Sequence, residues 1–144
     1  MVTDDNNFDE LQDALDDGLA DGLERLHGKT LAKLIDNMSS GQDALGNAWQ
    51  PLAAETIEAK GSATPLIDES RLISDINAAS EVDRDELEGI IGTNLEYAKP
   101  HELGAPEAGI PRRPIFAPAG DLAAELSEDE LSVAIGEAIA EVEL

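Results

Sequence analysis

A chain of 144 residues supports one hydrophobic core, so residues 1–144 are expected to fold as a single domain. Hydrophobic residues make up 42% of the chain and aromatic ones only 3%, which favours a modest, largely helical core; the absence of cysteine excludes disulfides, thiolate catalysis and sulfur-ligated metals. The 32 acidic and 9 basic residues give a formal net charge of −23, which disfavours binding to DNA phosphates because such binding requires clustered Lys or Arg.

A long amphipathic helix is predicted in the N-terminal segment, residues 1–38. Its apolar residues recur in steps of three or four, as on one face of a helix, at Leu11, Leu15, Leu19, Leu23 and Leu26. Asn7 is placed to act as the N-cap, with Glu10 three residues later. The pattern continues beyond Gly28, either as the same helix bent there or as a second short helix. We expect the leucine face to pack into the core.

Short elements are predicted in the middle of the chain. Residues 39–47 read as a connection, and residues 53–60 and 68–76 as two short helices. Asp68 is placed to cap the second helix, whose inner face is formed by Leu72, Ile73 and Ile76.

A β-hairpin is predicted next, followed by a short helical or turn segment at residues 95–103. Val82 belongs to the first strand, residues 83–85 to a polar turn, and Leu87, Ile90 and Ile91 to the second strand. Gly89 within the second strand indicates a bulge or a close approach of another segment to the backbone.

Residues 104–118 are rich in glycine and proline and are predicted to form an extended arm or an edge strand around Ile115 and Phe116. The four prolines, at positions 106, 111, 114 and 118, exclude a helix and a central strand. A C-terminal helix is predicted at residues 127–142, where Ser127 and Glu130 have capping-box spacing. Its inner face is expected to comprise Leu131, Ile135, Ala138, Ile139 and Val142.

No catalytic residues, cofactor or metal site are predicted. His27 and His101 do not stand at metal-ligand spacing, and His101 beside Glu102 is expected to be a hydrogen-bonded structural pair. Arg112 and Arg113, framed by Pro111 and Pro114, are the only adjacent basic pair in the chain. They either form internal salt bridges to an acidic helix face or contact the carboxylates of a neighbouring subunit.

The spread of acidic residues along the whole chain indicates a salt-rich cytoplasm. An acidic interaction tail or a nucleic-acid mimic would concentrate its charge in a block. At about 1 M salt the Debye length is roughly 3 Å, so repulsion between distributed carboxylates is nearly removed. No stretch of about 18 apolar residues is present and the chain opens with Asp4 and Asp5, so we expect neither a membrane span nor a signal peptide.

Ordered landmarks between Trp49 and Phe116 resemble the virion morphogenesis family typified by the G protein of phage Mu, together with related tail-completion proteins. They are Trp49-Gln50-Pro51-Leu52 with Thr56 and Lys60, Pro65-Leu66-Ile67-Asp68 with Arg71-Leu72 and Ile76, Ile91-Gly92-Thr93-Asn94, Tyr97-Ala98, His101, Gly104, and Ile110-Pro111-Arg112-Arg113-Pro114-Ile115-Phe116. The chain departs from the family at three places: Glu69-Ser70 replaces Thr-Gly, Glu102 replaces Gln, and Arg112 replaces a small residue.

The resemblance implies an α+β fold with a family-like core at residues 49–118. It also implies a non-enzymatic virion protein of a haloarchaeal tailed virus, assembled in the host cytoplasm as a ring, expected to be a hexamer, at the head–tail junction. Neighbouring neck or connector proteins and tail terminator or tail tube proteins would be its partners, and DNA would pass through the lumen without sequence-specific binding.

The arm at residues 104–118 is expected to contact a neighbouring subunit, because an extended segment can add to a sheet edge with little loss of entropy. The predicted contact residues are Pro111, Arg112, Arg113, Pro114, Ile115 and Phe116. The alternative function is an acidic adaptor of a halophilic cell, whose N-terminal helix binds a partner.

Overall fold

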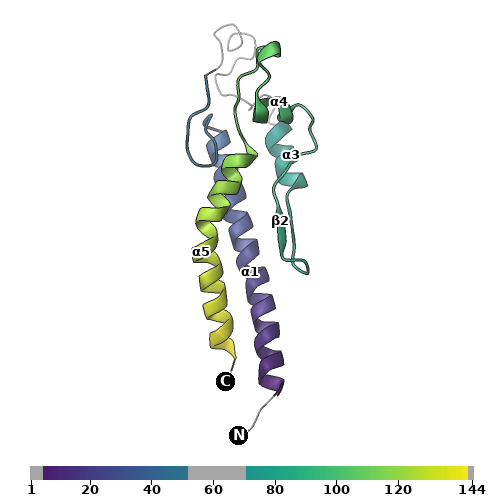
Figure 1. Ribbon diagram of the computed structural model, residues 1–144, viewed down its shortest axis with the longest axis vertical. Helices are drawn as coiled ribbons and strands as arrows, with labels where there is room; N and C mark the ends of the chain where they lie inside the picture. The colour runs from purple at the N-terminus through teal and green to yellow at the C-terminus, as the bar shows by residue number, and fades with distance from the viewer. Residues whose placement is uncertain (1–4, 52–70, 143–144) are drawn as a thin grey trace.

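The computed structural model describes residues 5–51 and 71–142, with side chains from Phe8 onward, and has an α+β fold dominated by helices (Figure 1). Two long helices, α1 (Asp5–Met38) and α5 (Phe116–Glu141), run side by side in opposite directions. Between them in the sequence lie α3 (Arg71–Ala79), β1 (Glu81–Asp83), β2 (Glu88–Ile90), α4 (Ala98–Leu103) and the 3-10 turn η2 (Pro106–Ala108). Three predictions lie outside the described residues: the helix at residues 53–60, the motif residue Leu52, and Asp68 as the cap of the helix at residues 68–76.

Helix α1 is one continuous element of 34 residues, about 51 Å long at 1.5 Å per residue. It passes through Gly28 without a break, which decides between the two alternatives left open there. The helix is already formed at Asp5, so the prediction that Asn7 is the N-cap was wrong.

The hydrophobic core lies where α1 ends and α5 begins. Leu34 and Met38 of α1 pack there with Trp49, Leu72, Ile76 and Ile115, all of which are buried. In the predicted leucine face of α1, by contrast, Leu26 is buried and the other four members are partly exposed. The expectation that this face packs into the core is met at Leu26, while the other four leucines are partly buried and lie outside the core cluster.

The predicted β-hairpin is confirmed, but its bounds differ: Asp83 belongs to the first strand, Leu87 lies in the turn with a φ of +52°, and Ile91 follows the second strand. Strands β1 and β2 pair in antiparallel register with Val82 opposite Gly89. The hairpin rests on α1: a Cβ built at Gly89 would lie 3.3 Å from His27 Cδ2, and His27 Nε2 is 2.8 Å from the Ile90 carbonyl oxygen. Gly89 thus marks a close approach. At the turn, Arg84 forms ion pairs of 2.9 Å with two acidic residues of α1, Asp21 and Glu24.

Helix α5 begins eleven residues earlier than the helix predicted at residues 127–142, so that boundary was wrong. Ser127 lies within the helix, where its hydroxyl donates to the Ala124 carbonyl oxygen at 2.8 Å instead of capping a terminus. Pro118 occupies the first turn of α5, a position at which a missing N–H breaks no intrahelical hydrogen bond. The predicted extended arm or edge strand around Ile115 and Phe116 was therefore wrong: the proline-rich segment contains the η2 turn, has no regular structure at residues 111–114 and is helical from Phe116 onward.

Small residues form the contact between α1 and α5. Cβ atoms built at Gly18 and Gly22 would lie 2.9 Å from Ala138 Cβ and 2.7 Å from Ala134 Cβ, respectively. The inner face of α5 therefore includes Ala134 and Ala138, both buried. The prediction of Ile135 and Ile139 as inner residues was wrong, since their exposed fractions are 38% and 45%.

Candidate functional site

Most landmarks of the sequence motif meet at the start of α5. The Trp49 indole N–H donates to the Pro114 carbonyl oxygen at 2.9 Å, across 65 residues of sequence. The Arg113 backbone N–H donates to the His101 carbonyl oxygen at 2.7 Å. Residues that are far apart in the sequence therefore join the loop after α1, the end of α4 and the segment that leads into α5. We call this arrangement the α5 junction.

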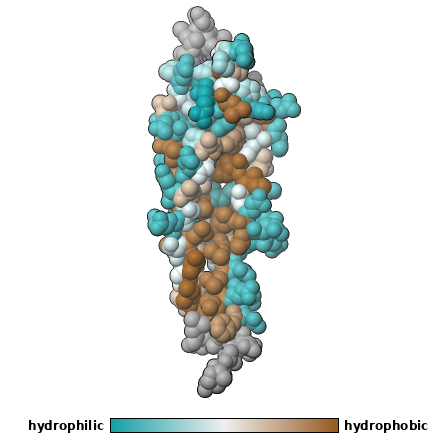
Figure 2. Space-filling model, viewed as in Figure 1, coloured by the Kyte–Doolittle hydropathy of each residue, from teal (hydrophilic) through white to brown (hydrophobic). Residues whose placement is uncertain are grey.

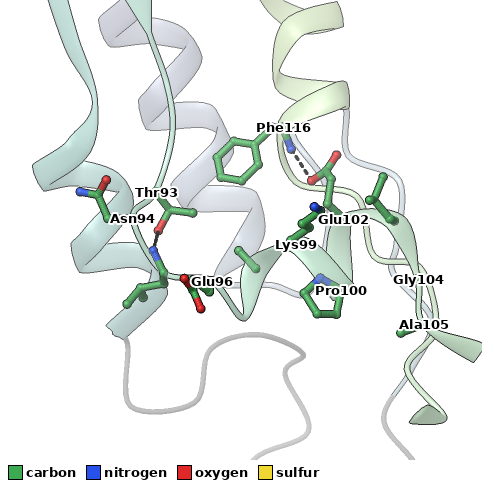
Figure 3. A pocket seen from close by; sticks show the side chains of 12 residues that line it. Thr93, Asn94, Glu96, Lys99, Pro100, Glu102, Gly104, Ala105 and Phe116 are labelled. Carbon is green, nitrogen blue, oxygen red and sulfur yellow. Dashed lines mark hydrogen bonds between the residues drawn. The ribbon is translucent and has the colours of Figure 1, made fainter. Parts of the chain in front are cut away.

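Glu102 of α4 is at the centre of the α5 junction (Figure 3). Its carboxylate accepts hydrogen bonds from the backbone N–H groups of Ile115 at 2.6 Å, Phe116 at 2.9 Å and Ala117 at 3.1 Å. These donors have no acceptor within the helix, and a negative charge at this end is favoured by the helix dipole. Pro118 follows without an N–H, so Glu102 satisfies the donors of the first turn from outside the helix.

Neither arginine of the predicted contact bonds a carboxylate in the described part of the chain. Arg113 is 5% exposed and donates to the backbone carbonyl oxygens of Gln50 at 2.9 Å and Pro51 at 3.3 Å. Burial lowers the pKa of its guanidinium. Arg112 is exposed and donates through Nε to the Glu102 carbonyl oxygen at 3.2 Å. The arginine pair therefore holds backbone segments of its own chain.

The predicted contact residues of the arm are divided by burial. Ile115 is fully buried and Arg113 nearly so, because both pack within their own subunit. The contact with a neighbouring subunit stays a prediction, and these two side chains offer it little exposed surface. Pro111, Pro114 and Phe116 are partly buried, which leaves Arg112 as the exposed member.

Gly104 has a structural reason to be glycine at the α5 junction. Its φ of +78° is in a region that favours glycine, and an added Cβ would lie 3.3 Å from the backbone nitrogen of Arg112.

Two other landmarks lie apart from the junction's hydrogen bonds. The Gly92 N–H donates to the Ser80 hydroxyl near the base of the β-hairpin at 3.3 Å, and Tyr97 is at the start of α4 with an exposed fraction of 42%.

An open groove of about 890 Å³ lies beside the junction, between α4, the loop at residues 93–96 and Phe116 (Figure 3). Two of the polar side chains at its walls are engaged in folding. Glu102 caps α5, and Thr93 donates its hydroxyl to the Asp75 carboxylate, which also accepts the Asn94 N–H at 2.6 Å. These hydrogen bonds, the one from Thr93 first, lower the pKa of Asp75.

Nothing in the described ranges forms a metal-binding set. Across residues 5–51 and 71–142, no group of three or more His, Asp or Glu side chains is arranged to hold a metal ion. No helix in those ranges is both long enough and apolar enough to cross a membrane. The hydrogen bonds of the α5 junction join segments that are far apart in the chain.

Sequence reasoning missed Glu102 as the key group of this joint. It assigned Glu102 to a structural pair with His101 and noted it as a departure from the family pattern, because the cap acts across 13 to 15 residues and leaves no local signal. Protein-family models, curated proteins and solved structures give no match to this chain.

Proposed function

We propose that the protein is a structural subunit of a tailed-virus particle, and that copies of it form a ring that completes the tail or joins it to the head. The proposal takes its viral setting from the resemblance between Trp49 and Phe116. The structural role is inferred from the α5 junction, where arginine and glutamate side chains bond the chain's own backbone.

The observation that carries the proposal is the α5 junction itself. Four separate landmarks meet in this joint: Trp49, His101 and the Arg113-Pro114 pair through hydrogen bonds, and Gly104 through its close approach to Arg112. A catalytic motif would place side chains toward a substrate, whereas these residues fix the geometry between the two long helices and the rest of the molecule. Such a framework suits a subunit that presents a rigid surface to its neighbours.

The acidic surface is compatible with this role. DNA that only passes through a ring needs no clustered cations, and a net charge of −23 prevents the ring from binding its phosphates. In a salt-rich cytoplasm, screening lets identical acidic subunits approach one another.

A genetic experiment tests the proposal. The reading frame is interrupted in the encoding virus, and the lysate is inspected by electron microscopy. We expect filled heads and separate tails without complete particles, and we expect recovery when the intact chain is supplied from a plasmid. Normal yields of complete, infectious particles without the chain would contradict the proposal.

A further inference from the structure

The β-hairpin formed by β1 and β2 lies alongside α1 and outside the hydrophobic core (Figure 1). Every residue from Asp83 to Ile90 is exposed, and Val82 is partly buried. Figure 2, in the same view, shows largely hydrophilic side chains (teal) along this side of the molecule and apolar ones (brown) over the two long helices. Burial of apolar surface therefore contributes little to the attachment of the hairpin.

Both sides of the contact between the β-hairpin and α1 carry an excess of negative charge. Residues 81–90 include five acidic side chains and one arginine, and residues 16–24 of α1 include four acidic side chains and no lysine or arginine. The next two cations of α1, Arg25 and Lys29, are bound to Glu130 of α5. The hairpin and α1 therefore repel each other unless their charges are screened or paired.

Polar contacts at the surface hold the β-hairpin on α1. Arg84 lies 2.9 Å from a carboxylate oxygen of Asp21 and 2.9 Å from one of Glu24. Of the residues that the structure describes, Arg84 alone joins the two elements by ion pairs. His27 Nε2 adds a contact of 2.8 Å with the Ile90 carbonyl oxygen. Exposed contacts of both kinds compete with water, so their strength is modest and the repulsion can outweigh them.

The distances decide how salt acts on the repulsion and on the ion pairs. Gly89 faces α1, so the neighbouring acidic residues of both strands, Glu81, Asp83 and Glu88, point to the other face of the hairpin. They are separated from the carboxylates of α1 by roughly 10 Å, the spacing of packed layers. The Debye length is roughly 10 Å at about 0.1 M salt and 3 Å at about 1 M. Salt therefore removes this repulsion and leaves most of the attraction across the 2.9 Å ion pairs.

We propose that the β-hairpin is a salt-controlled strap, which lies on α1 at high salt and detaches as a unit at low salt while the core stays folded. An isolated two-stranded hairpin is marginally stable at best, so the strands lose their pairing once they leave α1. Detachment uncovers Leu23 and His27, since a Cβ built at Gly89 would lie 3.6 Å and 3.3 Å from their side chains. This part of α1 is thus covered or accessible according to the ionic strength around the chain.

Hydrogen–deuterium exchange of the purified full chain measures the attachment, because the amides of residues 81–90 exchange through the detached state. Trp49, the only tryptophan and a buried core residue, reports on the core through its fluorescence. Lowering KCl from about 1 M to about 0.1 M at constant pH should speed the exchange of residues 81–90 at least about tenfold before the Trp49 emission changes. Exchange that is independent of salt or faster at high salt, or loss of hairpin and core at the same salt concentration, would overturn the inference.

Two variants change the charge balance in opposite directions. In about 0.1 M KCl, Arg84→Gln should speed the exchange of residues 81–90 at least about threefold, because it removes both ion pairs. The double variant Glu81→Gln, Glu88→Gln should slow this exchange at least about threefold, because it removes two negative charges of the hairpin and leaves the ion pairs intact.

Lys33→Gln is the matched control for Arg84→Gln. It also removes one positive charge at an exposed position, but Lys33 forms no ion pair with any residue in the described part of the chain. It should change the exchange of residues 81–90 by less than about twofold. Equal effects of Arg84→Gln and Lys33→Gln, or an unchanged exchange rate in the double variant, would each refute the salt-controlled strap.

Discussion

The carboxylate of Glu102 bonds three consecutive backbone N–H groups at the start of α5, although it belongs to another helix. The residue at the N-cap position, Ile115, has no polar side chain and cannot perform this function locally. One acidic side chain therefore determines where a helix of 26 residues begins and ties it to α4.

We predict that Glu102→Gln lowers the free energy of unfolding by about 1–2 kcal/mol. The amide keeps one acceptor oxygen but loses the negative charge and the second acceptor. Urea denaturation at constant high salt measures the change. Glu107→Gln, at an exposed position of the η2 turn, is the control and should have an effect within about 0.5 kcal/mol. Equal stabilities of the two variants would show that the cap is unimportant.

Glu130 is the second carboxylate with a structural role, since it is buried in the α1/α5 contact and bonded by two cations of α1. Lys29 bonds one oxygen, and Arg25 Nε lies 3.3 Å from the other. These interactions, that with Lys29 first, lower the pKa of Glu130. The folded state therefore binds fewer protons at this group than the unfolded state does, and the resulting stability is lost as the pH falls through the lowered pKa.

A pH titration of stability tests this assignment. Between about pH 5 and pH 3, the free energy of unfolding should fall more steeply for the wild type than for Glu130→Gln, which cannot titrate at this position. Glu128→Gln, at an exposed position of the same helix, should retain the slope of the wild type. Parallel curves for the wild type and Glu130→Gln would contradict the role of the ion pairs.

At the scale of elements, sequence patterns correctly predicted the elements that form through interactions between residues close in the sequence. The β-hairpin followed from alternating residues around a polar turn, and α1 from its leucine spacing. The start of α5 could not be predicted, because its cap comes from α4 and its capping-box sequence lies mid-helix. The inner face of α5 was also misjudged: Gly18 and Gly22 admit Ala134 and Ala138 and leave the larger Ile135 and Ile139 outside, a choice made by the partner helix.

The helix contact predicts opposite effects for two glycine substitutions in α1. Gly22→Ala should lower the free energy of unfolding by about 1–3 kcal/mol, because its Cβ would lie 2.7 Å from Ala134 Cβ. Gly28→Ala, where no atom lies within 4 Å of the added Cβ, should raise it by about 1 kcal/mol through helix propensity. Thermal or urea denaturation measures both, and a gain of stability in Gly22→Ala would refute the close contact.

At the scale of the whole molecule, the net charge of −23 predicts that stability depends on salt. Raising KCl from about 0.1 M to about 1 M shortens the Debye length from roughly 10 Å to 3 Å and should raise the free energy of unfolding. The double variant Asp13→Asn, Asp17→Asn, at exposed positions of α1, should show a smaller gain. A salt-independent wild type would contradict the interpretation of the acidic composition.

The salt dependence and the α5 junction belong to one proposal, in which a rigid acidic subunit associates with copies of itself in a virus particle. Cryo-electron microscopy of purified particles from the encoding virus tests this claim most directly. The account predicts repeated density at the head–tail junction that fits α1 and α5. Complete particles whose resolved neck and tail contain no copy of the chain would contradict it.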